Sequence, residues 1–502
     1  MGFTTKIIVK CEACGCVISQ TFSSKRVDST NGKKTAFDIN KKMVSTFNKF
    51  GRGHAAMELF SIGLGMNSVS SASYFSLQNL IQKENYNFVV KILTEARQKV
   101  RETHIKENPD INPDSILNIA VSYDGTWAKR GFTSNYGVGC VIDIFTGLVI
   151  DYEVLSKYCH TCTITEKQLG KESPEFYIWK EGHKTKCAKN YDGSSPGMEV
   201  EAASRLWKRS KQIGFRYTTV LSDGDSKTFI HLQQMNVYGS EFSITKEECV
   251  NHIAKRLGTG LRNLVKEWRG KNITLGGKTQ GNLKEATIVK LTNYYRAAIV
   301  QNAPDVDRMK NSVLATLYHC ASTDEKPLHK RCPEGENSWC FFNRALAKSE
   351  KPKSHKTEIH TPLNAIVIEK MIPLYQRLSS KELLRRCTRA KTQNANESLH
   401  SVIWNICPKE IFVSSRKVDM AVAEAISLVN QGQYLTEMAK KSKISPIACR
   451  VSKLRDQRRI KQKTRRCLDA EIKRRQATRV SKIIREDAKK KEEGVLYGAG
   501  EF

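Results

Sequence analysis

The sequence predicts an α/β protein with a mixed sheet, and three patterns support this fold class. Residues 116–156 contain three consecutive strand-like runs rich in β-branched and apolar residues. An amphipathic helical pattern and a fourth strand follow over residues 198–225, so the order β-β-β-α-β lies within one unit, as in mixed sheets. Residues 255–385 are mostly polar with helical spacing. We therefore expect a sheet core that is interrupted by a long all-helical insertion.

The N-terminal segment, residues 1–36, carries Cys11, Cys14 and Cys16 between short β-like stretches. Cys11 and Cys14 form a CxxC pair, but no matching second pair follows closely. A free-thiol turn and the remnant of a metal finger both remain open interpretations.

Residues 37–115 are expected to form an N-terminal helical region. From Phe88 to His104 the apolar residues recur at helical spacing. The sequence ENPDINPD then breaks this pattern and predicts a linker.

The first part of the core is expected over residues 116–254. Its second and third strands are joined by a short turn at Thr146-Gly147, which indicates a hairpin. A polar segment rich in Cys and His interrupts the core over residues 158–190. The helix that follows places Ala202 and Leu206 on one apolar side.

The remaining chain returns to the core and ends in a basic tail. Residues 386–440 are expected to complete the core with a helix that begins near Asn394. Residues 441–502 are expected to form a basic helical tail, because residues 441–490 hold 19 Lys and Arg against 5 Asp and Glu. Such a segment suits phosphate contacts, nuclear targeting or a solvated tail.

The net charge points to a polyanionic partner. The chain has 502 residues, and its formal charge at pH 7 is 83 − 51 = +32. Because so large an excess repels itself unless something neutralises it, the charge favours DNA or RNA over a merely basic, soluble protein. No run approaches the roughly 18 apolar residues of a membrane span, and no signal-peptide core is visible. We expect an intracellular chain without a membrane partner, whose 15 cysteines are reduced or bind metal.

Acidic residues follow two predicted strands and lie in one predicted helix. Asp124 is expected to end the first strand, and Asp223 the fourth, with Asp225 two residues on. Glu397 lies early in the helix that begins near Asn394. Taken singly, each residue is more typical of an ordinary turn or helix N-terminus. Together, on so basic a chain, they predict a site for two divalent ions, since carboxylate oxygens are the ligands that Mg²⁺ prefers.

The blocks around these acids, SYDGTWAKRG, LSDGDSKTF and NANESLHSVIW, resemble those of an animal-type Mutator-like DDE transposase of the MULE superfamily. The resemblance covers residues 37–435. Residue by residue, Asp124 matches the first Asp of the triad and Glu397 matches the Glu. Asp223 matches the second Asp, with Asp225 as the alternative.

This resemblance implies a fold and a reaction. The fold is an RNase H-like core with a helical insertion before the Glu-bearing helix, which the 397 − 223 = 174 residue gap can contain. The reaction is cut-and-paste DNA transposition, with two Mg²⁺ or Mn²⁺ ions at the triad. The partners are double-stranded DNA, as transposon terminal inverted repeats and as target, and further copies of the chain in a homo-oligomer in the nucleus.

Accessory residues follow from the same resemblance. The superfamily carries a Cys/Asp-x-x-His motif after the second Asp, and CVNH supplies Cys249 and His252 here. The resemblance implies that His252 lies near the active site against DNA, whereas the alternative is a Cys-His pair packed in the core. Asn396 and His400 flank Glu397, and His400, one helical turn along, is expected to face the site.

Segment 158–190 predicts a structural zinc site. Its ligands are Cys159, Cys162, His183 and Cys187, spaced C-x2-C-x20-H-x3-C, with His160 as the alternative fourth ligand. Four protein ligands leave no open position on zinc, so this metal is expected to hold the segment together rather than to catalyse.

A second Cys/His cluster lies in the helical insertion. Cys320, His329, Cys332 and Cys340 form the best set for a second zinc, and His319 is also nearby in sequence. The outer spacings are less regular than in the first cluster. The alternative is a group of thiols packed near Trp339.

Two basic stretches are candidate DNA contacts. Residues 255–272 carry six Lys and Arg in eighteen residues, and the tail contains RRIKQKTRR. The alternative is a solvated polar helix face. The residues expected to contact DNA are Lys255, Arg256, Arg262, Arg458, Arg459, Arg465 and Arg466.

The sequence leaves two classes of function open. The first is an active DNA transposase. The second is a domesticated or truncated, non-catalytic, zinc-containing DNA-binding protein derived from one. A housekeeping RNase H-type nuclease is disfavoured by the long insertion and the two Cys/His clusters.

Overall fold

The computed structural model describes residues 2–27, 36–129, 133–223, 226–277, 279–439 and 445–468, with shorter pieces as far as residue 485. The chain divides into two compact units, and each is described by itself. The first unit holds residues 1–218, 227–244 and 394–456, and the second holds residues 219–226, 245–393 and 457–502. None of the described helices combines the length and the apolar character that crossing a membrane requires.

A five-stranded sheet has the strand order β5-β4-β3-β6-β7. β3 pairs antiparallel with β4 and β4 with β5, whereas β6 and β7 run parallel. The sheet is therefore mixed, as predicted. Its strands are β3 (Leu117–Trp127), β4 (Tyr136–Asp143), β5 (Val149–Ser156), β6 (Phe215–Ser222) and β7 (Thr245–Glu248).

The predicted hairpin joins β4 to β5. Gly147 adopts a positive φ of 73°, and Asp143 Oδ2 accepts hydrogen bonds from Thr146 N at 2.7 Å and Thr146 Oγ1 at 2.8 Å. An acidic side chain that satisfies the backbone two or three residues on is a common turn device. The Thr146-Gly147 prediction is confirmed.

Strand β7 was not predicted, because its sequence TKEE is short and charged. The strand is nonetheless mostly buried, since Glu247 is paired with Arg389 at 2.6 Å and Glu248 with Arg256 at 2.9 Å. Buried charges are tolerated when they are paired in this way.

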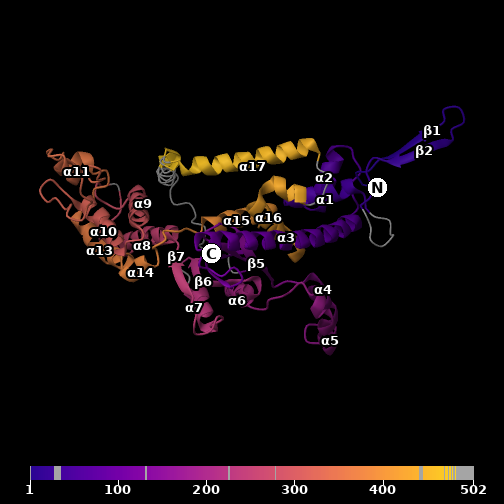
Figure 1. Cartoon of the computed structure of the whole chain (residues 1–502), viewed down its shortest axis with the longest axis horizontal. Helices are drawn as coiled ribbons and strands as arrows, with labels where there is room; N and C mark the ends of the chain where they lie inside the picture. The colour runs from indigo at the N-terminus through magenta and orange to yellow at the C-terminus, as the bar shows by residue number, and fades with distance from the viewer. Residues whose placement is uncertain are drawn as a thin grey trace. The chain divides into compact units, whose positions relative to one another are not determined.

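In the first unit, long helices cover one face of the sheet. Helix α3 (Ser71–Glu107) lies alongside α16 (Ser415–Ala439) (Figure 1). Helix α15 (Asn394–Ile406) packs against α16 and on β3 and β4. α3 is much longer than the 88–104 stretch that the sequence marks. It begins after Ser70, which caps it by accepting a hydrogen bond from Ser73 N. The shared apolar core includes Val89, Leu93, Val138, Ile142, Leu399, Ile403, Val422 and Ile426.

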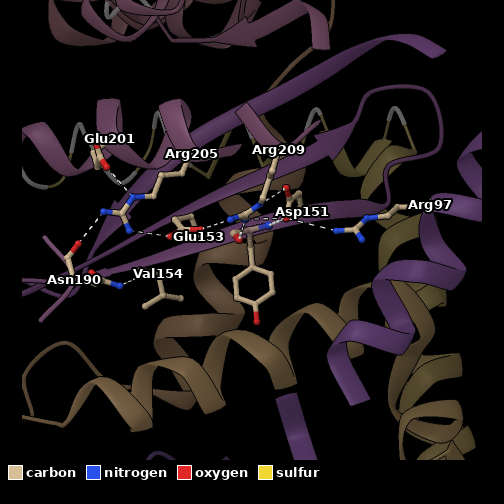
Figure 2. Close-up of polar contacts among 9 residues, drawn as sticks. Arg97, Asp151, Glu153, Val154, Asn190, Glu201, Arg205 and Arg209 are labelled. Carbon is tan, nitrogen blue, oxygen red and sulfur yellow. Dashed lines mark hydrogen bonds and ion pairs between the residues drawn. The ribbon is translucent and has the colours of Figure 1, made fainter. Parts of the chain in front are cut away.

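The other face of the sheet carries α6 (Gly197–Arg209), and arginines fasten helices to the edge strand β5 (Figure 2). Arg209 Nε lies 2.9 Å from Asp151 Oδ2, and Arg209 Nη1 lies 2.5 Å from Glu153. Arg97 of α3 reaches Asp151 at 3.6 Å, and Arg205 reaches Glu153 at 3.2 Å. Because the Asp151 side chain is only 4% exposed, these arginines neutralise a charge that would otherwise be costly to bury.

The remaining elements of the first unit lie around this core. The exposed hairpin β1–β2 pairs antiparallel, and α1 and α2 pack against α3 around Val44, Met57 and Tyr74. The segment 158–190 forms two short helices and a 3-10 turn. The bounds are β1 (Lys6–Lys10), β2 (Val17–Phe22), α1 (Asp38–Lys49), α2 (His54–Gly63), α4 (His160–Leu169), α5 (Pro174–His183), η1 (Lys184–Lys186), η2 (Ser210–Ile213) and α7 (Ser226–Met235).

The second unit is helical apart from the end of β6 and strand β7. Its apolar core is built from α8, α9, α10, α13 and α14, with Leu257, Leu291, Tyr295, Val313 and Met371 fully buried. α17 (Pro446–Cys467) is exposed and basic, and its residues are divided between the units. The other bounds are α8 (Val250–Gly270), α9 (Glu285–Asn302), α10 (Val306–Ala321), α11 (Phe341–Ala347), α12 (His355–Glu358), α13 (Ala365–Leu378) and α14 (Lys381–Arg385).

Candidate active site and Cys/His clusters

Asp124 lies within β3, three residues before the strand ends. The prediction that it ends the strand is wrong, because Thr126 and Trp127 continue the ladder opposite Val138 and Gly137 of β4. The Asp124 side chain is 24% exposed, so it is accessible from solvent although its strand is central in the sheet.

The prediction that the strand ends at Asp124 was wrong because Gly125 follows it. Asp-Gly is a frequent turn pair, but here the glycine allows close packing: a Cβ on Gly125 would lie 2.8 Å from Glu199 Cγ of α6. Gly137 and Gly139 of β4 are equally close to Met198 and Ala202 of the same helix. The glycines therefore seat α6 on the sheet instead of reversing the chain.

The alternation of side chains along β3 separates a packing face from the face of Asp124. Tyr123 donates to the Glu199 carbonyl at 2.6 Å, and Trp127 Nε1 donates to the Ser195 carbonyl at 2.7 Å. Ser122, Asp124 and Thr126 point to the opposite face, because successive residues of a strand alternate. That face is covered by α15.

Helix α15 carries an exposed Glu397 in its first turn and is anchored on both sides of Asp124. Asn396, which is fully buried, accepts from Ser122 Oγ at 2.5 Å and donates to the Cys140 carbonyl at 3.3 Å. Trp404 Nε1 donates to Thr126 Oγ1 at 2.8 Å. The contacts hold Glu397 on the helix that packs against the strand of Asp124.

His400 lies beside Asp124, with Nδ1 3.5 Å from Asp124 Oδ2. Burial, assisted by Lys409, lowers the pKa of His400 to about 4. His400 is therefore neutral at pH 7, and its contact with Asp124 is a dipolar contact and no ion pair. Its Nε2 is buried without a hydrogen-bond partner among the described residues.

Asp223 belongs to the second unit, where it directly follows β6. The CVNH motif begins beside the end of the same strand, since Cys249 N donates to the Ser222 carbonyl at 3.3 Å. His252 lies in the first turn of α8, and its hydrogen bond with Cys249 raises the pKa of His252, to which Asp223 also contributes. Asp225 lies outside the described residues.

Cys249 is a buried thiol that joins two segments of the second unit. Its Sγ accepts from Gln393 N at 3.4 Å, one residue before α15 begins. Burial acts to raise the pKa of Cys249, but the hydrogen bonds from His252 and Gln393 outweigh it, and the pKa is lowered.

The basic residues predicted to contact DNA fall into two groups. On α8, Arg256 pairs with Glu248 at 2.9 Å, and Arg262 Nε lies 3.0 Å from Glu285, so both guanidinium groups hold carboxylates. Lys255 precedes them on the same helix. The tail residues lie on the exposed surface of α17: Arg458, Arg459, Arg465 and Arg466.

The first Cys/His cluster, defined by Cys159, Cys162, His183 and Cys187, is brought together by α4, α5 and η1. Its ligand atoms lie within 4.8 Å of one another. Cys159 Sγ is 3.3 Å from His183 Nε2, and the sulfurs of Cys162 and Cys187 are 3.4 Å apart. These four residues can hold a metal ion and are the set that the spacing predicted.

His160, the alternative ligand, points elsewhere. Its Nδ1 lies 3.1 Å from the Tyr158 hydroxyl, and it does not belong to the cluster. The His183 ring instead stacks on Trp179, with centroids 4.6 Å apart.

The second Cys/His cluster consists of His319, His329, Cys332 and Cys340, again with ligand atoms within 4.8 Å. It differs from the predicted set in one member, because His319 replaces Cys320. Cys320 is buried in the helical core, where desolvation raises its pKa to about 12.

The sequence did contain a signal for this exchange. On α10, Met309, Val313, Leu317 and Cys320 recur at helical spacing and form one apolar stripe. Adjacent residues on a helix point about 100° apart, so His319 leaves this stripe and faces the cluster.

A family model described as Mutator-like transposase matches residues 1–340 of the chain. The match covers more than half of the 502 residues, and the chain belongs to the Mutator-like transposase family. The matched stretch includes Asp124, Asp223 and both Cys/His clusters and ends before Glu397. No curated protein matches the chain. Membership of this family indicates a DNA transposase and, with it, an enzyme of the nuclease and transesterase kind.

Proposed function

We propose that this protein is a cut-and-paste DNA transposase whose catalytic residues are Asp124, Asp223 and Glu397 on an RNase H-like core. The observation that carries the proposal is the docking of α15 on β3. Asn396, His400 and Trp404 of that helix contact β3 or β4 around Asp124. The exposed Glu397 therefore lies on the helix that packs against the strand of the accessible Asp124. The mixed sheet and the family assignment support the fold and the reaction class.

The donor groups fit hard divalent cations. Asp124, Asp223 and Glu397 offer carboxylate oxygens, which Mg²⁺ and Mn²⁺ prefer. Two such ions, when bound, would generate the attacking oxygen nucleophile and stabilise the leaving oxygen of a phosphodiester. The neutral His400 adds no positive charge beside Asp124, so the carboxylate keeps its affinity for cations.

The two Cys/His clusters are proposed as structural zinc sites. Each offers four thiol or imidazole ligands, which is the closed set of structural zinc. Neither cluster is assigned a part in the reaction.

The substrates are proposed to be double-stranded DNA, both transposon terminal inverted repeats and target. The net charge of +32 and the exposed basic face of α17 support a polyanion partner. We further propose that the protein works in the nucleus as a homo-oligomer, as the family resemblance implies.

The test is cleavage of labelled transposon-end DNA with Mg²⁺ or Mn²⁺. Asp124→Asn, Asp223→Asn and Glu397→Gln should each lower the cleavage rate by at least about 1,000-fold, which corresponds to about 4 kcal/mol of lost transition-state stabilisation. DNA binding by gel shift should persist. Glu410→Gln, an exposed carboxylate shortly after α15, is the matched control and should cut normally.

Three outcomes would change the proposal. If Asp223→Asn cuts and Asp225→Asn does not, the second aspartate is Asp225. If all triad variants cut like wild type, the site is elsewhere. If wild type binds DNA but never cuts with either metal, the protein is a non-catalytic DNA-binding derivative of a transposase.

A further inference from the structure

A chain of hydrogen bonds leads away from the second Cys/His cluster through residues that are not among its four possible ligands. His329 presents Nδ1 to the thiols, at 3.4 Å from Cys340 Sγ and 3.8 Å from Cys332 Sγ. Its other nitrogen, Nε2, lies 2.9 Å from Nε2 of His355. Both imidazoles are buried, at 4% and 6% exposure.

Asp324 determines which nitrogen of His355 carries a proton. Its Oδ1 lies 2.6 Å from His355 Nδ1 and also accepts from the His355 backbone N at 2.7 Å, while Ser354 Oγ donates to Oδ2 at 2.6 Å. A carboxylate only accepts, so His355 Nδ1 is the protonated nitrogen. In the neutral ring, Nε2 of His355 is then an acceptor.

The orientation of His329 follows from that acceptor. His329 must supply the proton between the two Nε2 atoms, so it is protonated at Nε2 and carries its lone pair on Nδ1. Ser322 Oγ contacts the same nitrogen, at 3.1 Å from His329 Nε2, and is itself held by a hydrogen bond that it accepts from Leu328 N at 2.5 Å. The lone pair therefore points at the two cysteines.

We propose that Asp324 and His355 form a positioning relay that holds His329 as an Nδ1 ligand of a zinc ion bound by His319, His329, Cys332 and Cys340. Metal-ligating histidines regularly donate their second N–H to a partner that fixes the tautomer and the ring orientation. Here that partner is a histidine, and a carboxylate stands behind it. His355 and Asp324 are not ligands themselves.

Ring packing keeps the relay in line. The rings of His329 and His355 meet edge to edge through their Nε2 atoms, with centroids 5.1 Å and planes 28° apart, and Phe342 stacks on His329 with centroids 4.5 Å apart. His355→Phe would keep an aromatic ring at this position and remove both nitrogens, so it would break the hydrogen bond to His329 and the one to Asp324.

The first cluster provides an internal reference in the same chain. Its histidine, His183, uses Nε2 toward Cys159, and its Nδ1 has no hydrogen-bond partner among the described residues. A substitution in the relay should therefore change one of two zinc ions and leave the other unchanged.

The test uses the full-length protein loaded with zinc. Metal content is measured by mass spectrometry, and the two dissociation constants are measured by titration with a chromophoric chelator. Wild type should hold two zinc ions per chain. His355→Phe and Asp324→Ala should weaken one of them by about 10- to 100-fold, the usual effect of removing such a partner, and leave the other unchanged.

Two controls separate positioning from folding. Glu325→Ala, at an exposed neighbour of Asp324, should retain both wild-type affinities. Cobalt substitution should show an altered visible spectrum in His355→Phe, because the ligand geometry has changed, while the far-UV circular dichroism is kept. The Asp324 side chain is 49% exposed, so Asp324→Ala is expected to fold.

The proposal is overturned if both relay variants bind two zinc ions with wild-type affinities and unchanged cobalt spectra. It is also overturned if wild type binds one zinc and Cys340→Ala leaves that stoichiometry unchanged, because the second cluster then holds no metal.

Discussion

The two Cys/His clusters use similar ligands in opposite surroundings. In the first cluster the ligands lie on or next to two ten-residue helices, α4 and α5, and the turn η1. On these helices Ile164, Leu169 and Ile178 are exposed and Phe176 is buried. In the second cluster, Cys332 and Cys340 pack with Ala315 and Phe342, next to the helical core that Cys320 joins. The first segment thus buries few apolar side chains, whereas the second cluster lies against a core that already exists.

This difference shows when the spacing of Cys and His residues is sufficient to identify the members of a cluster. When a metal organises its own segment, the ligands must be close in sequence and regularly spaced. When the ligands join an existing core, helix faces decide which of two neighbouring residues reaches the metal, as His319 and Cys320 show.

The largest effect is expected from removing a ligand of the first cluster. Cys187→Ala should abolish amide-exchange protection throughout α4 and α5, because structural zinc supplies on the order of 10 kcal/mol to segments that it organises. Hydrogen exchange followed by mass spectrometry measures this change. Protection in α9 and α10 serves as the control, and intact protection in α4 and α5 would show that the segment has a core of its own.

A ligand of the second cluster should act on stability without erasing its helices. Cys340→Ala removes a fully buried ligand and should lower the unfolding free energy by about 3 kcal/mol or more, as losses of metal sites do. Chemical denaturation followed by circular dichroism measures the change. Native far-UV signal before the transition is expected, and its collapse would mean that metal organises this region too.

The exchanged residues can be compared directly. His319→Ala should release one zinc ion, whereas Cys320→Ala should keep both and cost about 1 kcal/mol, an ordinary value for a single core substitution. Zinc content and denaturation midpoints of the two variants are measured together. Zinc loss in Cys320→Ala with retention in His319→Ala would restore the ligand set predicted from spacing.

The smallest effect is expected at His160. Because its ring contacts Tyr158 and not the cluster, His160→Ala should keep both zinc ions and change stability by less than about 0.5 kcal/mol, as is usual for exposed positions. Chelator titration against wild type checks this. A weakened first site would assign His160 a part in binding.

Several features of the fold could be predicted because they depend on local patterns. The strands around Val141 and Ile150 and the Thr146-Gly147 turn follow from β-branched runs and turn chemistry. Strand β7 could not be predicted, because its buried glutamates are stabilised by ion pairs that the sequence does not reveal. Glu247 pairs with Arg389, which is far away in sequence, and Glu248 pairs with Arg256, one of several basic residues on α8.

For the candidate site, the acidic residues could be identified from the sequence, but the residues that pack around them could not. Gly125 suggested a turn, and only the approach of Glu199 from α6 shows that it serves packing within a strand. The role of Asn396 depends on Ser122 and Cys140, which are more than 250 positions away in sequence. The relay behind His329 was equally invisible, because His355 lies 26 positions away with no regular spacing.

The amide of Asn396 also ties the position of α15 to the register of β3. A slip of one residue in a strand turns every side chain to the opposite face, so a misaligned β3 would present Tyr123 and Gly125 where Ser122 and Asp124 belong. Neither offers the serine hydroxyl that Asn396 binds at 2.5 Å. The hydrogen bond of Asn396 therefore favours the docking of the helix that bears Glu397 on β3 in this register over its docking on a strand shifted by one residue.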